Sequence, residues 1–327
     1  ARYVARIARQ KGCDIIHVRS RAPAWWAFHA ARLAGCRFVT TFHGTYTIPD
    51  GPAGFFKRRY NAILTKGDLV IAISHFIANH IINHYPTPWG KIRIIARGID
   101  EQRFDPNQVD AARIARQRSA WQLDHHTQNR LRPVILLPGR LTRWKGQMLM
   151  IEALARLPRP RPLCVLVGAS QGRGRYLQEL HQLAQVKGVA EDVRIWQAAD
   201  DLPAAMMIAD LIVSASTDPE AFGRVSAEAM MMGKPIIAPA HGGACEQIDH
   251  LKTGFLFQPG SAASLAAGLE TMLHLSAPAR TAITSHARAK ALQQFTCGQM
   301  QQKTMRVYDE VMRTRRIIKP AHAFQNA

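Results

Sequence analysis

The sequence predicts an α/β protein of two similar domains, each built on a doubly wound, parallel β-sheet. Short, continuously apolar runs alternate with helical patterns along the chain, and the alternation stops after Gly98 and restarts near Arg130. Strands of a parallel sheet are buried on both faces, so they are apolar throughout and are separated by helices. The chain has 327 residues, 47% of them hydrophobic, which is enough for two cores. Two such domains in tandem form a cleft at the carboxyl ends of their strands, where folds of this class bind ligands.

The first domain is predicted to cover residues 1–98. Continuous apolar runs predict its strands, and helical patterns fill the intervals, with Gly35 and Pro86 marking two helix ends. The predicted strands are 14–18, 37–42, 69–74 and 91–96, and the predicted helices are 24–35, 55–67 and 76–85.

Residues 99–130 are polar and irregular, which predicts a linker with one short helix. The second domain, 131–296, repeats the alternation, with strands at 133–139, 163–168, 193–196, 211–216, 235–240 and 254–257, and helices at 146–157, 176–187, 203–209 and 223–232. Closing helices are predicted at 262–275, 280–294 and 299–315. Residues 297–327 are expected to form a C-terminal helix and tail that packs back on the first domain.

The chain is strongly basic, with 43 Lys and Arg against 23 Asp and Glu and a formal net charge of +20. This charge suits nucleic acid, an acidic membrane surface or a phosphorylated substrate, or reflects only an arginine-rich composition. The basic residues are spread along the chain, which disfavours nucleic-acid binding. Five scattered cysteines form no Cys-x-x-Cys pair, so we expect neither a disulfide framework nor a zinc site. No apolar run approaches 18 residues. We therefore expect a cytoplasmic protein.

The stretch DPEAFGRVSAEAMMMGKPIIAPAHGG, residues 218–243, places two carboxylates, Glu220 and Glu228, eight positions apart. The strand 211–216 precedes it, so Glu220 lies in a loop at the mouth of the predicted cleft. Gly223 opens the next helix, whose free N–H groups suit phosphate. The alternative is that Glu220 caps this helix and Glu228 is a solvated helix residue.

This stretch resembles the E-x7-E signature of family 4 glycosyltransferases, which are retaining enzymes of the GT-B fold that use nucleotide-sugar donors. The resemblance extends to LLPGRLTRWKGQ, ISHFIANHI, ARGID and GFLFQPG, in segments spread along the chain. It implies the GT-B fold, two Rossmann-like domains facing a cleft, and transfer of a hexosyl group to an acceptor hydroxyl in bacterial envelope glycan or lipopolysaccharide synthesis. The alternatives are another GT-B activity such as a nucleotide-sugar epimerase or a phosphorylase, a basic nucleic-acid-binding protein, and an inactive paralogue.

The resemblance also implies roles for individual residues. Glu220 is expected to contact the donor sugar, Glu228 the nucleotide ribose, and Arg140 and Lys145 the diphosphate, whose departing charge they stabilise. His43, at a strand end of the first domain, resembles an active-site histidine near the sugar. The further donor-side candidates are Gly223, Phe222 and Glu246, and the acceptor-side candidates are Ser74, Arg58 and Arg59.

No cofactor and no metal are expected, because the sequence has no Asp-x-Asp pair and no ligand cluster of convincing spacing. The expected partners are a nucleotide sugar and a glycan or lipid-linked acceptor. Residues 51–64 interleave Phe55 and Phe56 with basic residues, which predicts contact with the acceptor or with an anionic membrane at its inner face. The alternative is an amphipathic helix whose aromatic residues are core. The base, the sugar, the acceptor and the oligomeric state stay open.

The first domain is expected to be incomplete. The resemblance implies a strand, a Gly-rich loop, a helix and a second strand ahead of 14–18, where the chain has one helical run, 1–12. In the strand order 3-2-1-4-5-6 we expect the missing strands between 14–18 and 37–42, so that both lose a pairing edge. We therefore expect this chain to be part of a longer protein and, by itself, to be poorly stable and nearly inactive.

Overall fold

The computed structural model describes residues 1–46, 51–123, 132–170, 172, 174–197 and 201–313. The chain forms two compact units, each with its own parallel sheet. The first unit comprises Ala1–Ala72, Ile77–Ile95 and the residues from Gln301 onward, and the second comprises Ile73–Phe76 and Ala96–Met300. The prediction of an α/β protein with two parallel sheets is confirmed.

The first unit contains a four-stranded parallel sheet in the order β1-β2-β3-β4. Its strands are β1 (Ile15–Val18), β2 (Arg37–Phe42), β3 (Leu69–Ala72) and β4 (Ile92–Ile94). The accompanying helices are α1 (Arg2–Gln10), α2 (Arg21–Ala34), α3 (Pro52–Asn61), η1 (Ala62–Lys66), α4 (His75–His84) and η2 (Trp89–Lys91), of which α4 begins in the second unit. The strands β1 and β2 match the predicted runs to within one residue, whereas β3 and β4 end two residues before the runs 69–74 and 91–96.

The pairing of β1 with β2 corrects one prediction. The two strands are hydrogen-bonded neighbours, in a register that runs from Ile15 opposite Arg37 to Val18 opposite Thr40. No gap for further strands lies between them, so the expectation that both lose a pairing edge there is wrong. Each short crossover leads to the adjacent position, which lets consecutive strands pair directly.

The long helix α13 (Cys297–Arg313) contributes its residues from Gln301 onward to the first unit. There, the ring of His17 on β1 lies between two hydroxyl groups, with Nδ1 2.7 Å from the Tyr308 Oη and Nε2 2.7 Å from the Thr41 Oγ1. Arg93 of β4 forms an ion pair with Glu310. Residues from both ends of the chain thus build this unit.

The second unit contains a six-stranded parallel sheet in the order β10-β9-β8-β5-β6-β7. The strands are β5 (Val134–Pro138), β6 (Leu163–Val167), β7 (Val193–Trp196), β8 (Leu211–Val213), β9 (Ile236–Pro239) and β10 (Phe255–Phe257). Residues such as Ile135, Leu166 and Val213 are fully buried in its core. Their continuous burial explains why these runs lack the alternating pattern of a half-exposed strand.

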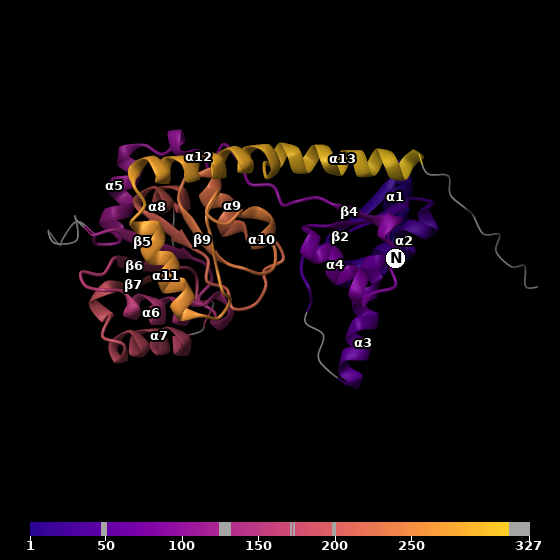
Figure 1. The fold of residues 1–327 in the computed structure, drawn as a ribbon. Helices are drawn as coiled ribbons and strands as arrows, with labels where there is room; N and C mark the ends of the chain where they lie inside the picture. The colour runs from indigo at the N-terminus through magenta and orange to yellow at the C-terminus, as the bar shows by residue number, and fades with distance from the viewer. Residues whose placement is uncertain (47–50, 124–131, 171, 173, 198–200, 314–327) are drawn as a thin grey trace, which may run out of the picture. The chain divides into compact units, whose positions relative to one another are not determined.

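Helices cover both faces of this sheet (Figure 1). The packing partners form two layers, one of α6, α7 and α11 and one of α5, α8, α9 and α12. Their bounds are α5 (Ala111–Ala120), α6 (Gln147–Arg156), α7 (Gly174–Val186), α8 (Leu202–Ile208), α9 (Arg224–Met231), α11 (Ala262–Leu273) and α12 (Ala277–Gln294). The short helices are η3 (Pro106–Gln108), η5 (Arg143–Lys145), η6 (Ala190–Asp192) and α10 (Ala244–Gln247). Within the described ranges, no helix combines the length and apolar character that crossing a bilayer requires.

Candidate active site

The strand order of the second unit has a switch point between β5 and β8. From this pair, β6 and β7 follow on one side of the sheet and β9 and β10 on the other. Sheets of this kind bind ligands at the carboxyl ends of the strands beside the switch point. The loop with Arg140 and Lys145 follows β5, and the loop with Glu220 follows β8. The two sequence motifs therefore meet at the position where this fold binds its ligands.

Glu220 and Lys145 form an ion pair at this position, although 75 residues separate them in the sequence. The Lys145 Nζ donates to the Glu220 Oε1 at 2.7 Å, and the Ser216 Oγ donates to the same oxygen at 2.5 Å. The side chains of Lys145 and Glu220 are only 13% and 18% exposed. Among the described residues, Glu220 Oε2 has no hydrogen-bond partner. Two hydrogen bonds within the protein thus fix one oxygen of the Glu220 carboxylate.

Glu228 lies in the second turn of α9 and is buried, with a side chain 7% exposed. The Arg224 guanidinium pairs with its Oε1, through Nε at 3.0 Å and through the terminal nitrogen at 2.9 Å. Burial raises the pKa of the Glu228 carboxyl, and the charge and hydrogen bond of Arg224 oppose this effect. The interpretation of Glu228 as a solvated helix residue is therefore wrong.

The indole of Trp144 contacts both cations of the β5 loop. The Lys145 Nζ lies 4.5 Å and the Arg140 guanidinium carbon 5.8 Å from the ring centroid. A cation over an indole face is attracted by the negative face of the ring. The Trp144 carbonyl also accepts a 2.8 Å hydrogen bond from the Thr217 amide, which links the two loops. Trp144 thus gathers two cations that would otherwise repel each other.

Glycines let these loops approach closely. A Cβ on Gly146, which has φ +74°, would lie 1.8 Å from the Ala215 carbonyl oxygen. A Cβ on Gly242 would lie 2.5 Å from the Glu220 carbonyl oxygen, and the Gly243 amide donates to that oxygen at 2.8 Å. No other residue has room at Gly146 or Gly242, so the backbone itself sets the position of Glu220.

The N-terminus of α9 is capped by Gly223, at φ +80°, without a side-chain hydrogen bond. The alternative that Glu220 caps this helix is therefore wrong. Phe222, predicted on the donor side, has a buried side chain whose ring packs edge-on against Phe295, with centroids 5.7 Å apart. Its contribution is to hold the preceding loop against the core.

Ser74 and Glu246 both have partners inside the second unit. The Ser74 hydroxyl donates to the Ala221 carbonyl at 2.6 Å, next to Glu220 in sequence. Glu246, in α10, accepts hydrogen bonds from the amides of His75 and Phe76 at 2.8 and 2.7 Å. These contacts give both residues a structural task.

Three predicted residues belong to the first unit, whereas the cluster just described belongs to the second. His43 is half-buried and directly follows β2. Arg58 and Arg59 lie in the last turn of α3, and both are exposed. Glu220, Lys145 and Glu228 therefore belong to the second unit. His43, Arg58 and Arg59 are not part of that unit.

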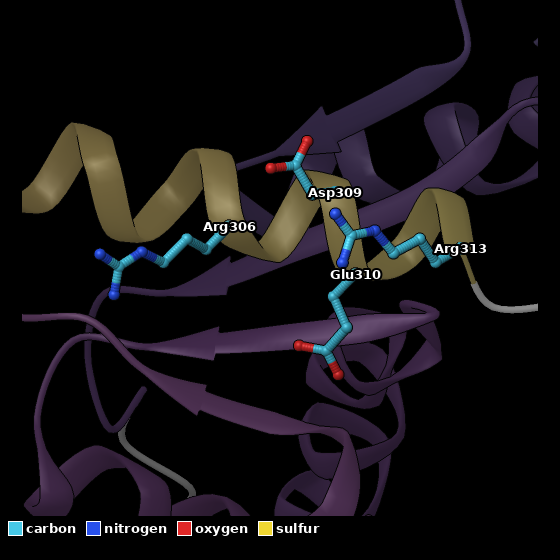
Figure 2. A pocket seen from close by; sticks show the side chains of 4 residues that line it. All are labelled: Arg306, Asp309, Glu310 and Arg313. Atoms are coloured by element: carbon cyan, nitrogen blue, oxygen red, sulfur yellow. The ribbon is translucent and has the colours of Figure 1, made fainter.

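A separate cavity of about 410 Å³ lies along α13 in the first unit (Figure 2). Its lining residues are Arg306, Asp309, Glu310 and Arg313, and Figure 2 shows the Glu310 side chain extending toward the neighbouring strands. Two cations and two carboxylates balance in charge, and Glu310 is already paired with Arg93. With Glu310 paired in this way, Arg306 and Arg313 share the hollow with the single remaining carboxylate of Asp309. Nowhere in the described ranges do three His, Cys, Asp or Glu side chains gather as a metal site would require.

Three residues of the site were not predicted from the sequence: Ser216, Trp144 and Arg224. Arg224 and Glu228 are four residues apart on a predicted helix, the spacing that puts two side chains on one face. Ser216 ends the predicted strand before Glu220, and Trp144 stands between the predicted cations. Position relative to the motifs could have identified all three.

Comparisons with known proteins identify the family of this chain. Residues 122–290 match the family model "Glycosyl transferases group 1", and residues 1–103 match "Glycosyltransferase Family 4". A D-inositol 3-phosphate glycosyltransferase of Jonesia denitrificans is 33% identical, over 92% of this chain and 73% of the relative.

Solved structures of glycosyltransferases have the same fold. A glycosyltransferase from Rickettsia africae matches with a TM-score of 0.86 and 32% identity, over 96% of this chain and 81% of its own. HepE of Anabaena, solved in complex with UDP, matches with a TM-score of 0.83 and 28% identity, over 94% and 81% of the two chains. The chain is thus a hexosyltransferase-type enzyme of the GT-B fold and belongs to the group 1, family 4 glycosyltransferases.

Proposed function

We propose that this enzyme transfers a sugar from a nucleoside-diphosphate sugar to an acceptor hydroxyl, with retention of anomeric configuration. The observation that carries the proposal is the pair of mostly buried carboxylates at the switch point, Glu220 and Glu228, each holding a cation on one oxygen. Carboxylate oxygens are good acceptors for sugar and ribose hydroxyls. The related HepE, which was solved in complex with UDP, supports a nucleotide as a ligand of this chain.

Each carboxylate keeps one oxygen for the donor. The contacts of Glu220 with Lys145 and Ser216 use Oε1, and those of Glu228 with Arg224 also use Oε1. In the described part of the chain, neither Oε2 has a hydrogen-bond partner. We assign Glu220 to the hydroxyls of the transferred sugar and Glu228 to the ribose hydroxyls.

The cations of the β5 loop suit the departing diphosphate. Lys145 and Arg140 both contact Trp144, at the end of a strand beside the switch point. Two cations and the first amides of α9 stabilise negative charge that develops as the glycosidic bond breaks. Because Glu220 is fixed by two hydrogen bonds, we propose that it positions the sugar. We propose that the leaving diphosphate takes the proton of the acceptor hydroxyl.

Two substitutions test these roles. Calorimetry with UDP, GDP and ADP identifies the nucleotide that the wild type binds, and kinetics with its sugars follow. Glu228→Ala is expected to weaken nucleotide binding, since losing a hydrogen bond to a charged group costs about 1.5–3 kcal/mol, or about 10–150-fold. Glu220→Ala should lower turnover more than affinity.

Glu270→Ala, an exposed carboxylate on α11, is the control and should behave as the wild type. If the Glu220 and Glu228 variants also keep wild-type kinetics, the donor site lies elsewhere. Failure of the wild type to bind any of the three nucleotides would refute the donor class itself.

For the acceptor, we propose a glycan or lipid-linked acceptor of the bacterial envelope, met at the inner face of the membrane. On α3, Phe55 and Phe56 are 63% and 69% exposed, so the alternative that they are core residues is wrong. Lys57, Arg58 and Arg59 follow directly, and the helix has no acidic residue. Exposed aromatic rings beside basic residues suit the surface of an anionic bilayer.

A further inference from the structure

Arg224 occupies a position on α9 that helix energetics disfavours. It is the first residue of the helix, where the partial positive charge of the helix N-terminus favours carboxylates and repels a guanidinium. Its pair with Glu228 also has the weaker orientation, because an acidic residue is better placed four positions before a basic one than after it. Stabilisation of the helix therefore does not explain an arginine at this position.

The pair instead serves the buried carboxylate. The Arg224 side chain is 51% exposed, whereas that of Glu228 is 7% exposed. A buried carboxylate without a partner is costly and tends to be protonated. Burial is the main influence that raises the pKa of Glu228, and Arg224 is the strongest influence against it, followed by the charges of Arg103 and Lys145. Arg224 is thus the principal group that favours the ionised form.

Two charged side chains on the helices that pack against α9 have partners of their own. The helices α12 and α10 pack against α9, and the adjacent strands β8 and β9 are apolar. From α12, Arg288 pairs with Asp105. From α10, the Glu246 carboxylate accepts two backbone hydrogen bonds. Within the described residues, Arg224 is the cation that pairs directly with the Glu228 carboxylate.

We propose that Arg224 is a positioning residue for donor binding, which fixes one oxygen of Glu228 so that the other meets the ribose hydroxyls of the nucleotide. The inference rests on the proposed function, because it takes Glu228 as the ribose contact. Arg224 acts through Glu228 and needs no contact with the donor. Its removal leaves the carboxylate in place but changes its charge and orientation.

The experiment measures affinity for the tightest of UDP, GDP and ADP, and for its 2′-deoxy analogue, by calorimetry between pH 6 and 8.5. The variants are Arg224→Leu, Arg224→Lys and Glu228→Gln, together with the double variant R224L/E228Q. Arg175→Leu is the matched control, because Arg175 also lies in the first turn of a helix and pairs with a glutamate four residues later, but on α7 and with a side chain 92% exposed.

Arg224→Leu should weaken binding about tenfold or more at pH 7, as expected when a charged partner is lost. The loss of affinity at low pH should begin at least about one pH unit higher than in the wild type, because an opposite charge typically shifts a neighbouring pKa by about 1–3 units. Discrimination against the 2′-deoxy analogue should shrink, and Arg224→Lys should restore part of it. Arg175→Leu should match the wild type throughout.

The double variant guards against loss of folding, because a neutral glutamine needs no counter-charge. Adding Arg224→Leu to Glu228→Gln should change affinity less than about twofold and abolish the shift in pH, as full coupling between the two residues requires. If Arg224→Leu leaves affinity, pH profile and deoxy discrimination unchanged, or if its effect persists fully in the Glu228→Gln background, the positioning role is refuted. Absence of nucleotide binding in the wild type would instead refute the proposed function, and this inference with it.

Discussion

Gly146→Ala tests whether the close approach of two loops holds the site together. A Cβ at this residue would lie 1.8 Å from the Ala215 carbonyl oxygen and 2.6 Å from the carbonyl carbon, far inside contact distance. These are backbone atoms, so the loop after β5 must move away from the loop after β8. That movement would separate Lys145 from Glu220, whose side chains now meet at 2.7 Å.

The expected loss of stability has two parts. A left-handed backbone conformation costs a residue with a side chain about 1–2 kcal/mol, and overpacking a well-packed site costs about 1–3 kcal/mol. Gly188→Ala separates the two, because Gly188 has a similar φ of +64° but open space around its Cβ position. Gly188→Ala should therefore lose only the first part, and Gly146→Ala should lose about 1–3 kcal/mol more.

Urea unfolding followed by circular dichroism measures both variants, and calorimetry with UDP, GDP and ADP measures binding at the site. Gly146→Ala should bind nucleotide more weakly than Gly188→Ala, which should bind as the wild type does. Equal losses of stability in the two variants, or undiminished nucleotide binding by Gly146→Ala, would show that the loops are not held by this contact.

Three further outcomes are expected. Transfer should continue in EDTA, because cations of the protein suit the diphosphate; activity that is lost in EDTA and restored by magnesium or manganese would contradict this. Burial is the main cause that lowers the pKa of His17 and His80 from 6.5 to about 4, so the unfolded chain binds more protons between these two pH values. The free energy of unfolding should therefore be highest above pH 6.5 and fall as the pH drops toward about 4. Denaturation at several pH values should show a flatter dependence in His17→Gln and His80→Gln, and an unchanged dependence would contradict this explanation. In co-sedimentation with anionic vesicles, the variant with Lys57, Arg58 and Arg59 replaced by Ala should bind less than the wild type, and with neutral vesicles the two proteins should not differ. Equal binding of the two proteins to anionic vesicles would refute the membrane proposal.

The sequence was sufficient to locate most of the helices and strands. Continuous apolar runs mark parallel strands because both faces of such a sheet are covered, and this pattern located β5 to β10 closely. The pairing of β1 with β2 was not predictable in the same way, because strand order depends on how each crossover packs and leaves no local pattern.

Within the site, sequence spacing gave Glu220, Glu228 and Lys145 as candidates but neither their pairs nor the neighbouring Ser216, Trp144 and Arg224. The contact between Lys145 and Glu220 joins two loops at the end of the sheet, so no local rule could supply it. The Arg224 and Glu228 pair has helical spacing and could have been predicted, but helix energetics argues against that order of charges. The burial of Phe222 depends on Phe295, which reaches it from another helix end.

The divided first unit has a consequence for synthesis of the protein. Domains generally fold in the order in which the ribosome makes them. Here the first unit combines residues that precede the second unit with residues from Gln301 onward, which follow it. His17 on β1 contacts Tyr308, and Arg93 on β4 pairs with Glu310. Tyr308 and Glu310 both follow the second unit in the chain, so these contacts can form only after that unit has been made. During translation, the unit made second is thus the first to have all of its residues, and the nascent N-terminal sheet must persist without its final helix until α13 has been made.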